Sequence, residues 1–293
     1  MKGFVLVDKP SGWTSHDVVA KTRGILRERK VGHAGTLDPM ATGLLVLAVG
    51  RVTRLLRFLQ DLPKVYEGTM MLGVATDTLD ADGAVLSREE MPVSQAEVEA
   101  AMKRFVGDIH QVPPMVSALK IDGRRLHELA REGKEVERAP RPVTIHDLEM
   151  TDFSPSNYPE VGFRVTCSKG TYVRTLADDI GRSLGGHAHL TELRRTNNGS
   201  LSVSEAVSIE QLQAHADAGT MAEVLLTPAS ALRDVVGYEV DEPLVGAVRN
   251  GVAIAANPTD VSEGSFVRVM HDGELLAMYR SNGSGLVAEV VLS

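Results

Sequence analysis

The sequence predicts an α+β protein, with a mixed, largely antiparallel sheet flanked by helices and a small β module at the C-terminus. Over the first 231 residues, apolar runs of strand length are interspersed with helix-like segments in irregular order. From residue 232 the pattern changes to short apolar runs separated by Gly, Asn and Asp turns. At 293 residues the chain is long enough for a large domain plus a small one, so we expect a division into 1–231 and 232–293.

The N-terminal elements follow from periodicity and capping signals. Phe4–Val7 reads as a buried strand, and Ser15 begins a helix that continues to about Leu26. The apolar run Leu44–Val49 predicts a second strand, and a short helix is expected over 52–59. Three arginines at helical spacing place a basic edge on one side of that helix, namely Arg51, Arg54 and Arg57.

The remaining elements are predicted in the same way. A capping box, Ser94 with Glu97, opens a helix to about Phe105, and Ser208 begins another. Residues 117–145 form a basic, Arg-rich excursion with a tight turn at Asp122-Gly123 and a charged helix over 124–132. Strands are expected at 64–73, 144–150, 161–167 and 190–196, and in the C-terminal module a helix at 243–249 and strands at 251–255, 266–270, 275–279 and 286–292.

Composition narrows the class of protein. The single cysteine, Cys167, excludes an internal disulfide and a thiolate zinc cluster. The sequence shows neither a signal peptide nor an apolar run of membrane-spanning length, so we expect a cytoplasmic protein. The acidic segment Thr76–Gly83 does not match the spacing of a calcium loop, so we expect no metal site there.

Charge is unevenly distributed along the chain. The net charge is −8, yet residues 1–64 carry eleven Lys/Arg against five Asp/Glu. Residues 117–145 are also net basic, whereas residues 234–293 carry three basic against nine acidic side chains. Positive charge therefore surrounds the N-terminal Gly-rich stretch, where a phosphate backbone could be held, although charged helix faces are common without such a role.

A carboxylate on a Gly-rich connection is the main candidate for chemistry. Asp38 lies within Gly32–Gly43, with an imidazole, His33, five positions before it and a strand close behind. The glycines allow the backbone to bend sharply or approach a ligand closely. Asp followed by Pro39 is also how a helix begins, with Asp as N-cap. The residues alone favour the cap and leave both interpretations open.

A second candidate is a helix start after a glycine turn. Tyr172 and Arg174 follow Ser168-Lys169-Gly170-Thr171, and helix N-termini attract anions. Arg174 could pair with a carboxylate from another segment, or it could form an ordinary interior salt bridge.

Seven segments, taken in order, resemble the TruB family of bacterial tRNA pseudouridine synthases. Their order and spacing make this resemblance specific over most of residues 3–200. The segments are V-D-K-P-S-G-W-T-S, G-H-A-G-T-L-D-P-M-A-T-G-L-L, K-V-Y-E-G, T-D-T-L-D-A-D-G, P-P-M-V-S-A-L-K-I-D-G-R-R-L, S-K-G-T-Y-V-R-T-L-A-D-D-I-G and L-R-R-T.

The resemblance implies a pseudouridine-synthase-like fold with a PUA-like C-terminal module, and an isomerase that converts uridine 55 in the T loop of tRNA. By matching position, Asp38 would start glycosidic cleavage, Tyr66 would stack on the base, and Arg174 would pair with Asp38. It further implies that the enzyme needs no cofactor and acts as a monomer. Residues implied to bind or support the substrate are His33, Tyr172, Leu193, Lys9, Lys64 and Asp80.

Two rival hypotheses belong to other classes. One is a tRNA-folding chaperone that binds the T stem-loop without needing chemistry. The other is a glycosidase with paired acids such as Asp38 and Asp80, which would release free base or sugar.

Overall fold

The computed structural model describes residues 2–117, 119–121, 123–126, 129, 132–134, 136–255 and 261–292. Its main sheet contains the strands β1 (Gly3–Lys9), β2 (Val31–His33), β3 (Thr42–Val49), β4 (Lys64–Leu72), β7 (Gly107–Gln111), β10 (Arg141–Ser154), β11 (Glu160–Cys167), β12 (Ala188–Asn198), β13 (Leu201–Ser202) and β14 (Leu225–Leu226). The flanking helices are α1 (Ser15–Leu26), η1 (Gly50–Leu55), α2 (Leu56–Gln60), α3 (Gln95–Lys103), α5 (Val173–Ser183), η2 (Val203–Glu205), α6 (Ile209–Ala218), η3 (Met221–Glu223) and α7 (Pro228–Ala231). Two hairpins lie off this sheet, β5 (Val74–Thr76) with β6 (Val85–Arg88) and β8 (Lys120–Ile121) with β9 (Arg124–Arg125).

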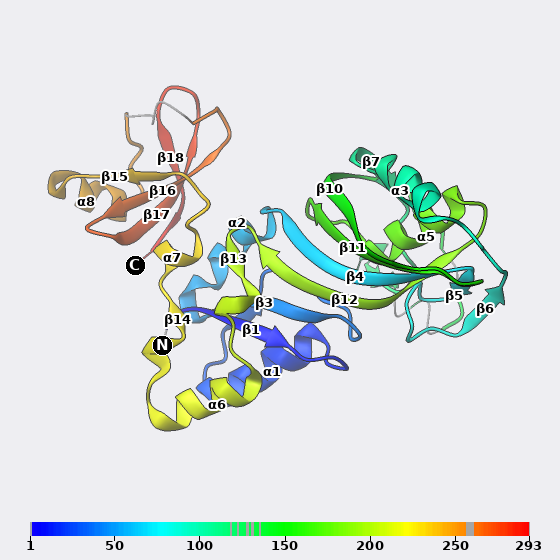
Figure 1. The fold of residues 1–293 in the computed structure, drawn as a ribbon. Helices are drawn as coiled ribbons and strands as arrows, with labels where there is room; N and C mark the ends of the chain where they lie inside the picture. Colours follow the sequence, from blue (N-terminus) through cyan, green and yellow to red (C-terminus); the bar gives the residue numbers. More distant parts are fainter. Residues whose placement is uncertain are drawn as a thin grey trace.

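The main sheet runs in the order β14-β1-β3-β12-β4-β11-β10-β7, with β2 paired to β3 and β13 to β12 (Figure 1). Every described pair along this path is antiparallel except β3 with β12, where Arg194 lies opposite Thr42 and Arg195 opposite Gly43. The mixed, largely antiparallel α+β fold predicted from the sequence is therefore confirmed.

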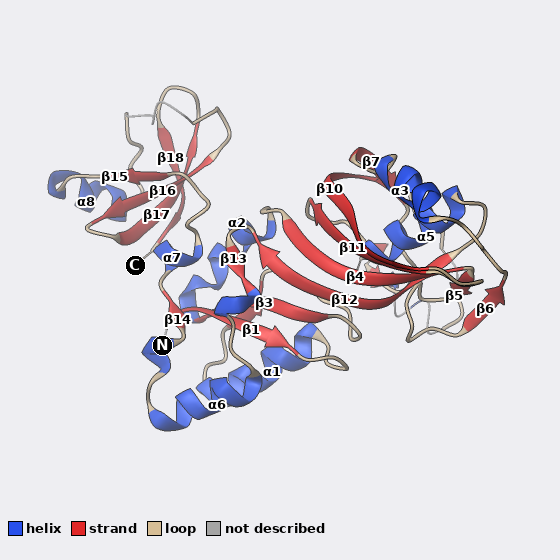
Figure 2. Ribbon diagram, viewed as in Figure 1, coloured by secondary structure: helices blue, strands red, loops and turns tan. Residues whose placement is uncertain are grey.

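The β1 end of the sheet is covered on both faces, which explains its continuous apolar runs. Alternate residues of β1 point to opposite sides, so Val5 and Val7 pack with α1 and α6. Phe4 and Leu6 pack on the other side, with η1, α2 and residues of the C-terminal module. Helices α1 and α6 lie together beneath this part of the sheet (Figure 2).

The β4–β11–β10 end has one covered and one solvated face. Helices α3 and α5 pack against the apolar face through Val98, Leu176 and Ile180, which join a core with Val161 and Phe163. The opposite face carries exposed charged side chains, including Glu67, Arg164 and Glu192. A half-solvated sheet of this kind is what alternating apolar and polar residues predict.

The structure refines several boundaries. Thr14 rather than Ser15 caps α1, in a capping box with Asp17. The helix predicted over 52–59 divides into η1 and α2. The helix predicted over 124–132 is wrong at its start, because Arg124 and Arg125 form strand β9; residues 127, 128, 130 and 131 of it lie outside the described residues.

The C-terminal module is a separate sheet in the order β15 (Gly237–Glu239), β16 (Phe266–His271), β17 (Glu274–Ser281) and β18 (Leu286–Val291), with helix α8 (Glu242–Arg249). The strand predicted over 251–255 is wrong, since only Ile254 forms an isolated bridge, to Leu286. The module docks on α2 through an edge-to-face contact of Phe58 and Phe266, with ring centroids 4.7 Å apart. Within the described chain, no helix is long and apolar enough to span a membrane.

Candidate active site

A cavity of about 770 Å³ opens beside the loop that joins β2 to β3. Its walls come from that loop, from β4 and β12, and from the start of α5. Six of the residues singled out from the sequence line it: Asp38, Lys64, Tyr66, Tyr172, Arg174 and Leu193. Segments that are far apart in the sequence thus meet around one space.

The loop that carries Asp38 is held by contacts with the N-terminal segment. The hydroxyl of Ser15 accepts a hydrogen bond from the Leu37 amide at 2.8 Å and donates one to the Leu37 carbonyl at 3.1 Å. The amide of Gly12 donates to the Pro39 carbonyl at 2.9 Å. No helix begins at Asp38 or Pro39, so the helix-cap interpretation is wrong. The Asp38 carboxylate instead lines the cavity.

Lys9 supports the same loop from below. Its side chain is fully buried, and its Nζ donates to the carbonyls of Pro10, Trp13 and Pro39. Burial lowers the pKa of Lys9 to about 8, against an opposing effect of Asp38. Lys9 is not among the residues that line the cavity, so the structure places it behind the loop rather than against a ligand.

Arg174 connects the two acidic residues of the site. Its Nε lies 2.9 Å from Oδ2 of Asp38, and its Nη1 lies 3.1 Å from Oδ2 of Asp80. The other donors reach the carbonyls of Thr78 and Val116, both at 2.8 Å. Only 4% of the Arg174 side chain is exposed, against 34% for Asp38, so one carboxylate remains open to the cavity while the guanidinium is enclosed.

Asp80 orients the arginine and does not line the cavity. Its side chain is buried and accepts hydrogen bonds from the Thr78 hydroxyl and the Asp82 amide as well as from Arg174. The surrounding walls raise the pKa of Asp38 by desolvation, and Asp80 adds to that rise, while the Arg174 charge opposes it. The arginine therefore favours the ionised carboxylate and fixes its orientation.

Other walls of the cavity are formed by strands and by the start of α5. Tyr66 projects from β4 and Leu193 from the neighbouring strand β12. Tyr172 caps α5, and the buried side-chain amide of Gln111 holds its backbone: Oε1 accepts from the Tyr172 amide at 3.0 Å, and Nε2 donates to the Tyr172 carbonyl at 3.3 Å. This role of Gln111 was not predicted from the sequence, because 61 residues separate the two partners.

Lys64 and His33 border the site in different ways. Lys64 lines the cavity and donates to the Gln60 and Leu62 carbonyls, and burial lowers its pKa to about 8. His33 is half-buried at the end of β2, where its Nδ1 accepts from the Gly35 amide at 3.3 Å. Desolvation lowers the pKa of His33, and its side chain is not among the cavity-lining residues.

Arg195 is a cavity-lining residue that was not predicted from the sequence. It lies on β12 two positions after Leu193, so the two side chains share a face of the strand. That alternation was the available signal. Its side chain is 3% exposed, and its guanidinium donates to carbonyls of β3 and of the Asp38 loop.

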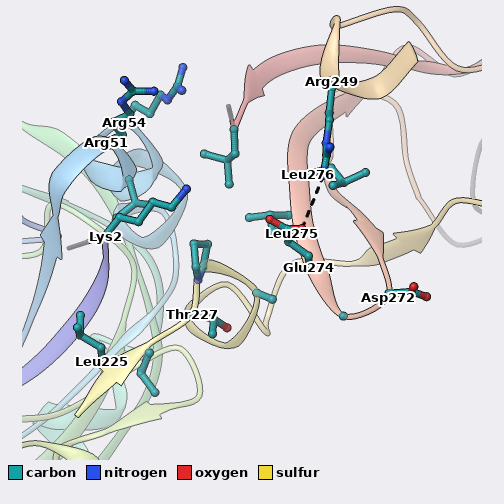
Figure 3. A pocket seen from close by; sticks show the side chains of 16 residues that line it. Lys2, Arg51, Arg54, Leu225, Thr227, Arg249, Asp272, Glu274, Leu275 and Leu276 are labelled. Atoms are coloured by element: carbon teal, nitrogen blue, oxygen red, sulfur yellow. Dashed lines mark ion pairs between the residues drawn. The ribbon is translucent and has the colours of Figure 1, made fainter. Parts of the chain in front are cut away.

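Two further groups lie away from this cavity. In the described chain, one cluster with metal-ligand spacing was found, Glu239, His271 and Asp272 of the C-terminal module. A second cavity, of about 580 Å³, lies between the main sheet and the C-terminal module. Lys2, Arg51 and Arg54 border it on one side (Figure 3). Neither includes a residue predicted to act in catalysis.

Comparison with known proteins identifies the family. Residues 23–173 match the model of the TruB family pseudouridylate synthase N-terminal domain, and residues 174–237 match the tRNA pseudouridylate synthase B C-terminal domain. The tRNA pseudouridine synthase B of Geobacillus thermodenitrificans is 42% identical over 95% of this chain and 94% of its own length. The enzyme of the same name from Aromatoleum aromaticum is 44% identical over 98% of this chain and 91% of its own length.

The fold agrees with that assignment. The structure titled as a Cbf5-Nop10-Gar1 complex has a TM-score of 0.78 at 27% identity and covers 99% of this chain and 84% of the matched chain. A structure of an H/ACA RNP bound to a substrate RNA has a TM-score of 0.77 at 25% identity, covering 99% of this chain and 85% of that one. On these sequence and structural matches, the chain belongs to the TruB family of pseudouridine synthases.

Proposed function

We propose that this chain is a tRNA pseudouridine synthase, an isomerase that converts uridine 55 of the T loop to pseudouridine. The observation that carries the proposal is the half-open Asp38 carboxylate, ion-paired with a buried Arg174, in a cavity shared with Tyr66. Several relatives bear the name tRNA pseudouridine synthase B, and this chain matches over 90% of their length. Their name supports both the reaction and the substrate.

The reaction requires a site that can hold a free base. Uracil must leave its ribose, rotate, and reattach through carbon, so a base that escaped would be lost to water. Extruding the nucleotide from the loop costs a few kcal/mol. Stacking on an aromatic ring is worth about 1–3 kcal/mol per base, and Tyr66 supplies such a ring in the cavity.

Within this proposal each cavity residue has a distinct task. Asp38 initiates cleavage of the glycosidic bond as a carboxylate, which Arg174 keeps ionised and aimed. Tyr172 and Leu193 line the uracil pocket, and Lys64 borders it. Lys9 and Asp80 act behind the surface, by holding the Asp38 loop and Arg174 respectively. His33 lies against the flipped nucleotide at the edge of the loop.

Other parts of the chain also have proposed roles. The basic segment 117–145 contacts the tRNA. This segment contains the hairpin β8–β9, and its last residues, 141–145, form the start of β10. Residues 1–231 form the catalytic domain and 232–293 the docked module. The protein acts as a monomer without a cofactor, in the cytoplasm where its tRNA substrate is found.

The proposed reaction is tested by tritium release from tRNA labelled at C5 of uridine. Wild type should release label from the T loop, whereas Asp38→Asn, which keeps the shape but loses the charge, should release none while still binding tRNA. Asp217→Asn removes an exposed carboxylate on α6 and should behave as wild type.

The three hypotheses predict different outcomes. A chaperone would show tRNA refolding in both proteins and no tritium release from either. A glycosidase would release free uracil, whereas isomerisation leaves the mass of the tRNA unchanged. Tritium release by Asp38→Asn at the wild-type rate would remove Asp38 from the mechanism.

A matched pair of charge reversals tests the basic segment. Replacing Arg124 and Arg125 by Glu should weaken tRNA binding and flatten its dependence on salt, because each lost phosphate contact reduces counterion release. Lys103 and Arg104, at the end of α3, provide a control of equal charge. Equal affinities for both double variants across a salt series would exclude a contact from the β8–β9 hairpin.

A further inference from the structure

Arg195 is a buried cation in the wall of the cavity, and its contacts join separate elements. Its Nε donates to the Leu44 carbonyl of β3 at 2.7 Å. Its Nη2 donates to the Gly35 carbonyl at 3.2 Å, and its Nη1 reaches the Thr36 carbonyl at 3.5 Å. Gly35 and Thr36 lie in the loop just before Asp38, so this guanidinium holds the loop against the sheet.

The same residue lies beside Tyr66. Arg195 and Tyr66 are directly opposite each other in the antiparallel pairing of β12 with β4, and both line the cavity. One guanidinium is therefore hydrogen-bonded to the segment that carries Asp38, on a residue paired across the sheet with Tyr66.

Burying the Arg195 guanidinium without a carboxylate partner is energetically unfavourable in itself. No carboxylate of the described residues forms an ion pair with Arg195, although taking a cation out of water is unfavourable until hydrogen bonds offset the lost hydration. An apolar side chain of similar volume could fill the space without that cost. What an apolar side chain could not supply is the fixed fork of donors, which suits several acceptors in defined directions.

We propose that Arg195 is a positioning residue, which sets the separation and orientation of the Asp38 loop and the Tyr66 hydroxyl between which the base reacts. The inference rests on the proposed function. Arg174 and Arg195 then divide the work: Arg174 contacts the Asp38 carboxylate itself, and Arg195 fixes the backbone that carries it.

Arg194 provides a matched control on the same strand. Its side chain points to the opposite face of β12 and forms a bidentate pair with Asp8, at 3.0 and 2.7 Å. Like Arg195 it is an arginine of one strand with a hydrogen-bonded guanidinium, but it does not line the catalytic cavity.

The test separates the rate of the chemical step from tRNA binding. Single-turnover tritium release and tRNA affinity are measured for wild type, Arg195→Lys, Arg195→Met and Arg194→Met. We expect the single-turnover rate to fall about 100-fold in Arg195→Met, the loss typical of a misplaced catalytic group, with affinity within about threefold of wild type. Arg195→Lys keeps the charge but not the fork, and should recover only part of the rate. Arg194→Met should match wild type.

A double-mutant cycle identifies the mechanism and allows for poor folding. Tyr66→Phe removes only the hydroxyl, so if Arg195 acts through it, Tyr66→Phe should lower the rate much less in an Arg195→Lys background than in wild type. If Arg195→Met does not fold, as judged by its thermal midpoint, Arg195→Lys and the cycle still give the result.

Three results would overturn the positioning role: an unchanged rate in Arg195→Lys and Arg195→Met, a loss fully explained by weaker tRNA binding, or strictly additive effects in the cycle. Absence of tritium release from wild type would instead overturn the proposed function, so the two failures are distinguishable.

Discussion

At the residue scale, the site depends on how two carboxylates share one arginine. Asp80 is enclosed and hydrogen-bonded, and it serves as the fixed partner, whereas Asp38 keeps a third of its side chain open to the cavity. Arg174 is held by Asp80, Thr78 and Val116, all contacts within the protein itself. The Asp38–Arg174 ion pair is therefore formed in the absence of tRNA.

Arg174→Lys should therefore be a severe change. A lysine presents one point charge and cannot reach both carboxylates and two carbonyls in fixed directions. We expect a loss of tritium release of at least 100-fold, and a loss of stability of about 3 kcal/mol because Asp80 is left buried without its partner. Urea unfolding and single-turnover rates measure the two effects. Arg182→Lys, whose guanidinium is exposed on the same helix, is the control.

Lys9 should make stability depend on alkaline pH. Its pKa is lowered from 10.5 to about 8 in the folded state, so between these values the unfolded chain binds a proton that the folded chain does not. Stability contributed by this residue should thus rise as pH increases from 8 towards 10.5, by about 1–3 kcal/mol. Lys9→Met lacks the group, so the difference in unfolding free energy between wild type and variant should grow over pH 7.5, 9 and 10. A difference that stayed constant would contradict this.

At the element scale, the parallel pairing of β3 with β12 brings the Asp38 loop next to the cavity-lining residues of β12. The Asp38 loop precedes β3, and Leu193 and Arg195 lie on β12. The strands meet where Gly43 lies opposite Arg195, with a φ of +99° at the glycine. A Cβ there would lie 2.3 Å from the Arg195 carbonyl oxygen, so only glycine allows this approach.

Two alanine substitutions at glycine should have opposite effects. Gly43→Ala should destabilise the protein by about 2–4 kcal/mol, because it adds both steric overlap and backbone strain. Gly24→Ala lies within α1, where the added Cβ would meet no atom within 4 Å apart from the helix's own backbone and the neighbouring residues, and should stabilise by up to about 1 kcal/mol through helix propensity. Thermal or urea unfolding of the two variants compares them directly, and similar values would refute the steric argument.

At the scale of the whole molecule, the C-terminal module shares a core with the main sheet. Leu275, Met278 and Val290 of the module belong to the same apolar cluster as Phe4 and Leu6 of β1. Arg57 of α2 also pairs with Glu289 of β18, at 2.9 Å. The contact is consistent with the module's acidic sequence, since docking uses apolar packing and a few pairs rather than a basic surface.

Phe266→Ala should loosen this docking. It removes the ring that packs edge-to-face on Phe58, at a cost of about 1–3 kcal/mol. The single tryptophan, Trp13, packs beneath β1 and reports on the main sheet alone, whereas circular dichroism reports on both parts. We expect the two signals to unfold together in wild type and at separate urea concentrations in Phe266→Ala. Val287→Ala, at an exposed position on β18, should leave them together.

The sequence by itself determined most of the local helices and strands, and its motifs indicated the protein family. Apolar runs, the Ser94 and Ser208 caps and the alternation along strands predict α3, α6 and the main strands, because these signals depend on neighbouring residues. The order of seven motifs pointed to the TruB family, which the comparisons confirm.

Only the tertiary structure decided what those residues do together. Asp-Pro at 38–39 has the local signature of a helix cap, and contacts from Ser15, Gly12 and Lys9 hold it as a loop instead. The link from Arg174 to Asp80 spans 94 residues, and that from Arg195 to Gly35 spans 160. Partners so far apart leave no periodic trace in one sequence, because their meeting depends on the order of strands in the sheet, and that order is fixed by packing of the whole chain.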